Sequence, residues 1–259
     1  MSIPLEDNYL DIIGKAQRGL GLTNVSLPKR ADDEAGLRKL AATLKLDPEA
    51  LVASAKQTWY PHDPGAIDGI ACFNTPFSDM TVNSYLVFDP QTKHAAAFDT
   101  GTDCEGMLKL APQRGLTIGL ILLTHSHGDH VFAFDLLKAK TKARGFSCEL
   151  EPVGGTETFA PGRQFDIGNL KVETRLTNGH SRGGVTYVVS GLSRRLAIVG
   201  DAMFAGSMGG GMFSYEDALR TNREEILTLP DDTVICPGHG PLTTVGEEKH
   251  HNPFFASRV

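Results

Sequence analysis

Apolar residues recur at helical spacing through the first 60 residues of the chain. The positions that define two predicted helices are Leu10, Ile13, Ala16, Leu37, Leu40, Ala41 and Leu44. Asp47 followed by Pro48 is typical of an N-cap and the first helical residue, which predicts a third helix running towards Trp59. The turn-rich stretch from Tyr60 to Gly65 then breaks the pattern. We therefore expect a helical N-terminal extension, residues 1–60, and a second domain, residues 61–259.

After this boundary the pattern changes to short runs of β-branched and aromatic residues, which predict strands. The runs are Ile67–Phe73, Val82–Phe88, Ala95–Phe98, Ile118–Leu123, Lys171–Leu176, Val185–Val189, Leu196–Val199 and Thr233–Cys236. Helical stretches are expected near Glu105–Gln113 and Tyr215–Leu229. Strands mixed with helices in this way indicate an α/β fold of layered sheets covered by helices.

Composition and charge narrow the class of protein. Apolar residues make up 41% of the chain and charged residues 22%, which is enough to bury a sizeable core. The formal net charge of −6 disfavours a nucleic-acid partner, because phosphate contacts need clustered Lys and Arg. The four cysteines form no closely spaced pair, so we expect free, buried thiols. No signal peptide or membrane-length apolar run is visible, and we expect a cytoplasmic protein.

Potential metal ligands gather in the stretch 124–130, Thr-His-Ser-His-Gly-Asp-His, at the end of an apolar strand. His125 and His127 can point the same way, because alternate residues of an extended chain share a face. Asp129 and His130 can turn towards a second point nearby. Imidazole and carboxylate ligands suit zinc, iron or manganese. The spacing therefore predicts a metal site.

Three later residues also follow predicted strands and lie in glycine-bearing turns: His180, Asp201 and His239. Small neighbours allow the backbone to swing such side chains inward. We expect these three residues to complete the site.

These motifs resemble those of the metallo-β-lactamase superfamily, and within it the glyoxalase II-like hydrolases. The resemblance rests on the 124–130 stretch, on Gly200–Ser207 and on Pro237–Pro241. It implies an αββα sandwich with a dinuclear centre, most simply of zinc, with iron or manganese as alternatives. By the resemblance, one metal is held by His125, His127 and His180, and the other by Asp129, His130 and His239, with Asp201 bridging both. Asp99 is expected to support the site rather than to bind metal.

The resemblance implies a hydrolase in which a metal-bound hydroxide attacks the carbonyl of a thioester, ester or lactone, with Asp129 and Asp201 as the catalytic carboxylates. One departure concerns the substrate: where many relatives carry Gly-Arg after the position of Ser207, this chain has Met208–Met212, without a basic residue.

Three alternatives stay open: a mononuclear iron oxidoreductase resembling persulfide dioxygenases, a lactonase, and a non-catalytic metal-binding sensor. We expect the protein to bind a small-molecule substrate and not to associate with a membrane. The N-terminal helices faintly resemble a lambda-repressor-like helix-turn-helix but lack a basic face, so we expect them to serve packing or homodimer formation. His62, His94, His250 and His251 are expected to lie outside the site, and Arg182 and Tyr187 could contact substrate.

Overall fold

The computed structural model describes residues 3–25, 27 and 30–256. Three helices come first: α1 (Tyr9–Gly19), α2 (Glu34–Leu44) and α3 (Pro48–Lys56). Asp47 caps α3 as predicted, since its carboxylate accepts a hydrogen bond from the backbone N–H of Ala50. The apolar positions predicted for α2 are all buried, but Leu10 of α1 is 46% exposed and Ile12 takes the inward position. Ile13 and Ala16 of α1 are buried as predicted, so the prediction was wrong only for Leu10.

The rest of the chain forms two six-stranded sheets. The first has the order β1-β2-β3-β4-β5-β6, with strands β1 (Ile70–Phe77), β2 (Met80–Phe88), β3 (His94–Phe98), β4 (Thr117–Leu122), β5 (Arg144–Cys148) and β6 (Glu157–Phe159). The second has the order β12-β11-β10-β9-β8-β7, with strands β7 (Gln164–Ile167), β8 (Leu170–Leu176), β9 (Val185–Ser190), β10 (Leu196–Gly200), β11 (Val234–Pro237) and β12 (Thr243–Thr244). The remaining helices are α4 (Glu105–Arg114), α5 (Gly128–Val131), α6 (Phe134–Thr141), α7 (Tyr215–Thr221), a π-helical turn η1 (Asn222–Ile226) and α8 (Val245–His251).

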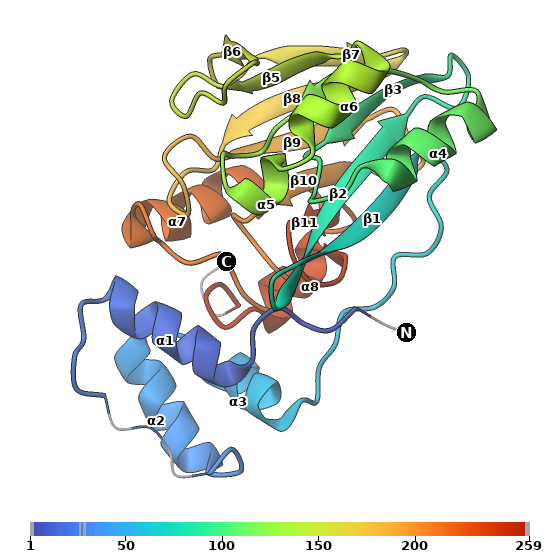
Figure 1. Cartoon of the computed structure of the whole chain (residues 1–259). Helices are drawn as coiled ribbons and strands as arrows, with labels where there is room; N and C mark the ends of the chain where they lie inside the picture. The colour runs from blue at the N-terminus through green and yellow to red at the C-terminus, as the bar shows by residue number, and fades with distance from the viewer. Residues whose placement is uncertain (1–2, 26, 28–29, 257–259) are drawn as a thin grey trace.

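The sheets face each other, and helices cover their outer faces (Figure 1). Between the sheets, Tyr85 and Phe98 of the first belong to the same apolar cluster as Tyr187 and Ile198 of the second. Outside the first sheet, α4 and α6 bury Met107 and Leu137, among others. Because both sheets have an apolar inner and outer face, the layers stack as helix, sheet, sheet and helix. The predicted αββα sandwich is confirmed.

The N-terminal helices share an apolar cluster with the outer layer of the second sheet. Ile12, Leu37 and Leu51 are fully buried in the cluster that also holds Ala197 of β10 and Phe255 near the C-terminus. Figure 1 shows α1, α2 and α3 gathered at one end of the sandwich, beside α8. The apolar faces of these helices are thus occupied within the chain. The division at residues 60 and 61, and a homodimer through these helices, stay predictions.

The predicted helix 215–229 is interrupted. It is α-helical from Tyr215 to Thr221 and then widens into the π-helical turn η1. The buried amide of Asn222, at the start of that turn, donates hydrogen bonds to the carbonyls of Ala202 and Ala218. The bulge thereby fastens the helix to the residue that follows Asp201, and π-bulges are often found at functional sites.

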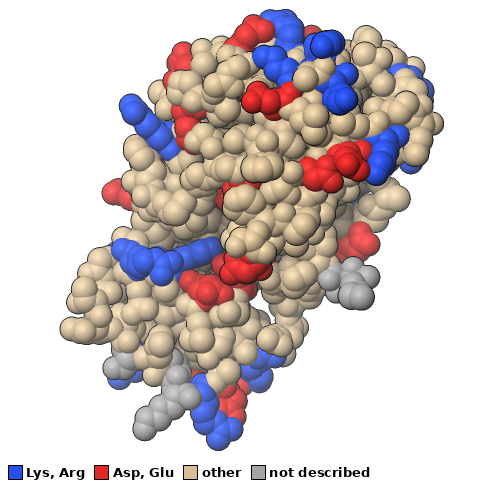
Figure 2. Space-filling view, in the orientation of Figure 1, with Lys and Arg blue, Asp and Glu red and all other residues tan. Residues whose placement is uncertain are grey.

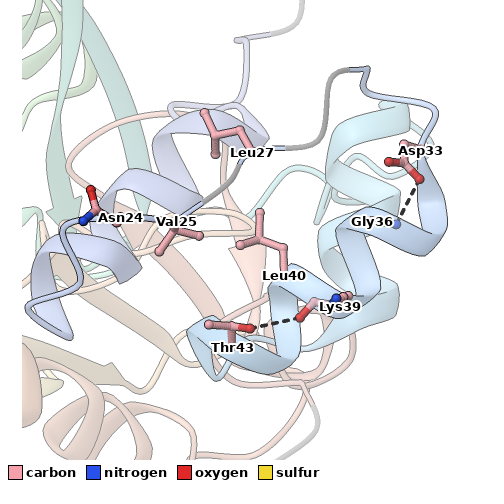
Figure 3. Close-up of a pocket in the computed structure, with 8 residues that line it drawn as sticks. All are labelled: Asn24, Val25, Leu27, Asp33, Gly36, Lys39, Leu40 and Thr43. Atoms are coloured by element: carbon pink, nitrogen blue, oxygen red, sulfur yellow. Dashed lines mark hydrogen bonds between the residues drawn. The ribbon is translucent and has the colours of Figure 1, made fainter.

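A cavity of about 430 Å³ borders α2 in the helical part (Figure 3). Its polar lining includes Asp33, whose carboxylate accepts a hydrogen bond from the N–H of Gly36 and caps α2. None of the predicted metal ligands lines this cavity. None of the helices in the described ranges is long and apolar enough to cross a bilayer.

Candidate metal centre

All seven predicted ligands lie where a strand ends. His125 and His127 follow β4, and Asp129 and His130 lie in the short helix α5. His180 follows β8, Asp201 follows β10 and His239 follows β11. Ligand side chains that are far apart in the sequence therefore lie together at one edge of the sandwich.

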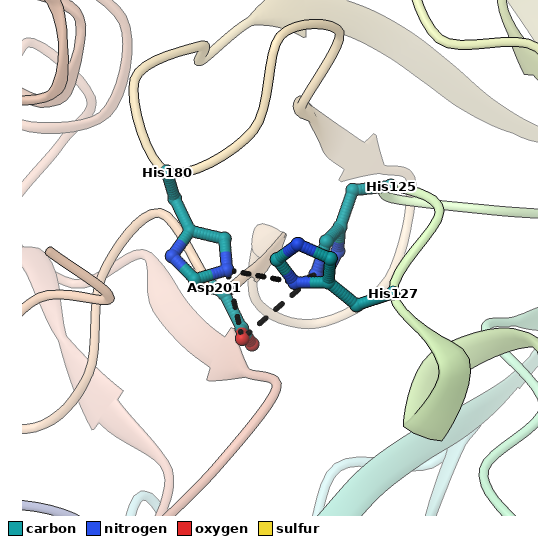
Figure 4. Close-up of side chains that lie close together, drawn as sticks. All are labelled: His125, His127, His180 and Asp201. Carbon is teal, nitrogen blue, oxygen red and sulfur yellow. Dashed lines mark hydrogen bonds and ion pairs between the residues drawn. The ribbon is translucent and has the colours of Figure 1, made fainter. Parts of the chain in front are cut away.

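The seven side chains form two adjoining groups, each with ligand atoms within 4.8 Å of one another. The first group is His125, His127, His180 and Asp201, and the second is Asp129, His130 and His239. In Figure 4 His125 and His127 from one loop, His180 from a second and the Asp201 carboxylate from a third converge on one point. His127 Nδ1 lies 3.0 Å from the Nε2 atoms of both His125 and His180.

Asp201 lies between the two groups. Its Oδ2 is 3.3 Å from His180 Nε2 in the first group and 3.5 Å from His239 Nε2 in the second. Its Oδ1 is 3.2 Å from His130 Nε2. Asp129 Oδ2 completes the second group at 3.2 Å from His239 Nε2. One carboxylate thus contacts both groups, which is the arrangement that a bridging ligand requires.

Asp99 fixes the orientation of two imidazoles without reaching the centre itself. Its carboxylate accepts hydrogen bonds from His130 Nδ1 at 2.8 Å and from Thr124 Oγ1 at 2.7 Å. Because Thr124 Oγ1 donates to Asp99, it accepts from His125 Nδ1, 2.9 Å away. Both rings therefore carry their proton on Nδ1 and leave Nε2 for a metal, as is common for metal-binding histidines. The expectation that Asp99 supports the site is consistent with this geometry.

Backbone carbonyls orient two further imidazoles in the same way. His180 Nδ1 donates to the carbonyl of Gly209 at 2.7 Å, and His239 Nδ1 donates to the carbonyl of Thr81 at 2.6 Å. A carbonyl can only accept, so the proton lies on Nδ1 in both rings. Four of the five imidazoles are thus held with Nε2 facing the centre.

Sequence reasoning missed Glu151, which joins two ligand-bearing loops. Its carboxylate accepts hydrogen bonds from the N–H and hydroxyl of Ser126, at 2.9 and 2.5 Å, and from the N–H of Gly183 at 2.7 Å. Burial raises the pKa of Glu151, but these hydrogen bonds outweigh it and lower the pKa below the usual value. No sequence motif marks this residue, because its role depends on the approach of loops that are far apart in the chain.

Gly238 has no room for a side chain. A Cβ at this position would lie 2.2 Å from Asp201 Oδ1 and 2.6 Å from His130 Cε1. The glycine of the Pro-Gly-His turn is therefore required so that the backbone can approach the two ligands closely.

The charges of the centre show that it favours a cation. Burial lowers the pKa of His130 and His239, but nearby carboxylates outweigh it. Asp201 and Asp99 raise the pKa of His130 to about 10, and Asp129 and Asp201 raise that of His239 to about 11. Burial alone would raise the pKa of Asp201, yet the positive charge of His130 holds it well below the usual range. The pKa of His125, by contrast, is held well below 6.5 by burial. A metal would replace the protons on His130 and His239, so we expect metal binding to release protons.

The residues fit a pair of divalent metal ions. His130 Nε2 and Asp201 Oδ1 are buried and lie 3.2 Å apart, and within the described residues neither has a hydrogen bond of good geometry. Unsatisfied buried polar atoms are uncommon in proteins and call for an explanation such as an ion. Five imidazoles and two carboxylates are also a donor set suited to zinc, iron or manganese.

The other histidines lie outside this centre. His62, His94, His250 and His251 are exposed, and His251 stacks on Trp59 with ring centroids 5.1 Å apart. Arg182 is exposed, whereas Tyr187 is fully buried and donates a hydrogen bond to the carbonyl of Leu123. Tyr187 is thus a core residue and cannot contact substrate.

The four cysteines are free, as expected from their spacing. Cys104, Cys148 and Cys236 are buried, but Cys72 is exposed. The expectation of buried thiols was therefore wrong for Cys72, which lies on β1, an edge strand of the first sheet.

Comparison with known proteins places this geometry in a family. Residues 78–239 match the model of the metallo-beta-lactamase superfamily. The chain is 29% identical over 208 residues to hydroxyacylglutathione hydrolase GloC of Haemophilus influenzae, covering 71% of this chain and 97% of that protein. It is 31% identical over 208 residues to the probable metallo-hydrolase YqgX of Bacillus subtilis, covering 69% of this chain and 94% of the relative.

Solved structures of the same fold agree. ETHE1 from Myxococcus xanthus superposes with a TM-score of 0.64 at 24% identity, covering 73% of this chain and 86% of that one, which shows the shared fold. TTHA1623 in a di-iron-bound form superposes with a TM-score of 0.58 at 26% identity, covering 71% of this chain and 100% of that one. The sandwich, the clustered ligands and the family match together show that this chain belongs to the metallo-β-lactamase superfamily.

Proposed function

We propose that this protein is a metal-dependent hydrolase in which water attacks the carbonyl carbon of a thioester, ester or lactone and the acyl C–S or C–O bond breaks, releasing a carboxylic acid and a thiol or alcohol. The observation that carries the proposal is the position of Asp201, whose two oxygens lie within 3.5 Å of imidazole nitrogens from both ligand groups. A carboxylate placed between two sets of imidazole donors supports a two-metal centre rather than two separate histidine clusters.

The seven side chains would hold two divalent ions, which would acidify a coordinated water and polarise the substrate carbonyl. Asp99 and the carbonyls of Thr81 and Gly209 keep the imidazole rings in place. Asp129, whose side chain is 11% exposed, is the carboxylate proposed to accept a proton from the attacking water. No nucleophilic serine or cysteine is needed, since water supplies the attacking oxygen.

Zinc is the proposed metal, with iron or manganese as alternatives. The family relative named hydroxyacylglutathione hydrolase supports a thioester substrate, and the di-iron-bound neighbour shows that iron can occupy this fold. The proposed partner is a small-molecule substrate. Lys and Arg are interspersed with Asp and Glu on the face shown in Figure 2, which does not suit a nucleic-acid backbone.

Metal content and turnover test the proposal together. We expect the purified protein to bind about two divalent ions per chain and to hydrolyse at least one member of a panel comprising a glutathione thioester, a homoserine lactone and a cephalosporin. His127→Ala should lose both bound metal and activity, because it removes the imidazole that contacts two others. His94→Ala is the matched control, an exposed histidine outside the centre that should retain both.

The same measurements separate the competing functions. One iron per chain, together with oxygen uptake in the presence of a persulfide, would favour the mononuclear oxidoreductase. Full metal content without turnover of any substrate would favour a sensor. Full activity of the His127→Ala variant would contradict the proposed centre.

A further inference from the structure

The N-terminal segment passes directly over the turn that carries His239. A Cβ on Gly240, the next residue, would lie 3.2 Å from the backbone nitrogen of Glu6 and 3.6 Å from the carbonyl oxygen of Pro4. Figure 1 shows this segment crossing the tip of the β1–β2 hairpin before it enters α1. Residues 4–6 therefore pack against the turn that carries His239, beside the second ligand group.

The segment is fastened in this position by polar contacts. Asp7 forms an ion pair with Lys15 and accepts a hydrogen bond of 2.5 Å from the hydroxyl of Ser207. Lys15 also donates to the carbonyl of Met208 at 2.8 Å and lies 5.0 Å from the ring centroid of Phe204. These contacts anchor the N-terminal segment to the loop that follows Asp201. The ammonium group of Lys15 is thereby engaged by Asp7 and by the loop itself.

A cavity of about 460 Å³ lies between this segment and the hairpin. It borders the second ligand group, since two of its lining residues are Thr81, whose carbonyl binds His239 Nδ1, and Gly240. Among the described residues, those that carry charge in its lining are Glu6 and Asp79, with no lysine or arginine. Apolar surface from Leu5 and Met80 accompanies the two carboxylates.

Glu6 is the lining residue without a structural role. Within the described part of the chain, no hydrogen bond or ion pair engages its half-buried carboxylate. Its backbone places it close to the centre, since a Cβ on Gly240, the residue after His239, would lie 3.6 Å from the Cβ of Glu6. A partly desolvated carboxylate without a partner is costly unless a cation or a hydrogen-bond donor occupies the cavity.

We propose that this cavity is the substrate subsite beside the second ligand group and that Glu6 binds an ammonium group carried on an apolar chain of the substrate. Asp79 adds negative charge at the exposed side, and Met80 and Leu5 contact the apolar chain. The inference rests on the proposed hydrolase function and narrows its substrate class. It predicts that cationic thioesters or esters are preferred over substrates with several carboxylates, such as glutathione thioesters, which the two acidic side chains would repel.

The experiment compares two thioesters that differ only in charge. S-acetylthiocholine carries a trimethylammonium group, and S-(3,3-dimethylbutyl) thioacetate is its uncharged isostere. We expect the metal-loaded full chain to have a KM about tenfold lower for the cationic ester, the size of a partly buried charge pair, with similar kcat for both. The preference should decrease with added salt, because ions screen the partly exposed pair.

Glu6→Gln should reduce the preference to about twofold or less, consistent with loss of one charge pair. Glu105→Gln, an exposed carboxylate on α4, is the matched control and should keep the wild-type preference. A Glu6→Gln protein that retains the full preference would overturn the subsite, as would equal KM values for the two esters in the wild type. Loss of one metal equivalent in Glu6→Gln would also overturn it, since Glu6 would then be a metal ligand.

A binding measurement keeps the subsite separate from the proposed reaction. Choline and the uncharged 3,3-dimethylbutan-1-ol are titrated calorimetrically into the metal-loaded protein and its Glu6→Gln variant. Selective choline binding that depends on Glu6 supports the subsite even if neither thioester is hydrolysed, in which case only the thioester reaction fails. Equal binding of the two alcohols, or choline binding unaffected by the substitution, contradicts the subsite.

Discussion

The buried carboxyl group of Glu248 should make the protein less stable as the pH rises. Glu248 lies on α8, is fully buried and receives three hydrogen bonds. Its Oε2 accepts from the N–H of Gly206 at 3.0 Å and from the amide of Asn252 at 2.7 Å. Its Oε1 lies 2.8 Å from the hydroxyl of Thr243. A protonated carboxyl satisfies all three partners, because Thr243 can accept its proton.

Burial raises the pKa of Glu248 from 4.5 to about 7, as its hydrogen bonds only partly offset the loss of solvation. A folded-state pKa above the unfolded value means that the native state binds more protons between pH 4.5 and 7. The free energy of unfolding therefore falls as the pH rises through this range. At about 1.36 kcal/mol for each pH unit, ionised Glu248 costs about 3 kcal/mol above pH 7.

Glu248→Gln removes this cost and keeps the hydrogen bonds, since a glutamine oxygen can accept from Gly206 and Asn252 while its amide donates to Thr243. We expect the variant to match the wild type near pH 4 and to be more stable by about 3 kcal/mol at pH 8.5. Urea unfolding of the metal-free proteins between pH 4 and 8.5 measures the difference.

Glu247→Gln provides a control of opposite sign. Burial raises the pKa of Glu247, but hydrogen bonds from His62 and Trp59 outweigh it and lower the pKa below 4.5. Its ionised form therefore stabilises the fold above that pH, and the glutamine variant should lose stability there. A Glu248→Gln protein whose stability follows that of the wild type across the whole range would refute the assignment of a raised pKa to Glu248.

Three substitutions test the support of the candidate centre. Asp99→Asn should lower metal affinity about 10- to 100-fold by weakening the orientation of His130, as measured by competition with a chelator. Glu151→Gln should lower metal affinity about tenfold, because its carboxylate holds Ser126, between His125 and His127, against Gly183 in the loop that carries His180; unchanged affinity would show that it is not a positioning residue. Gly238→Ala should reduce the free energy of unfolding by about 1–3 kcal/mol and prevent full metal loading, because its methyl group would collide with Asp201; normal metal content would argue against this packing.

Much of the candidate site could be predicted from the sequence because its ligands have two separate signatures. The first is dense local spacing, with four candidate ligands between His125 and His130. The second is position, since His180, Asp201 and His239 each follow a strand in a glycine-bearing turn. Glu151 has neither signature. It lies in the turn after β5 and contacts the ligand loops only because the fold brings them together.

Secondary structure was predicted best where apolar runs are long and their pattern is unambiguous. The strands from Val82, Ala95, Ile118 and Lys171 lie within one or two residues of the observed bounds. The predicted strand Ile67–Phe73 lies instead at Ile70–Phe77, because pairing with β2 sets its bounds. The short strands β5, β6 and β7 and helices α6 and α8 were not predicted, since segments of three to eight residues carry too few periods to be distinguished from loops.

The sequence by itself determined the family, the layered α/β class and the candidate ligands, because these follow from local spacing and from side-chain chemistry. Only the tertiary structure decided which residues support them. These are Asp99, which orients His130, Glu151, which joins two ligand loops, and the N-terminal segment with Glu6, which packs beside His239. The physical reason is that hydrogen bonds and desolvation depend on distances between segments up to about 200 residues apart, such as Asp7 and Ser207, and no local pattern encodes those distances.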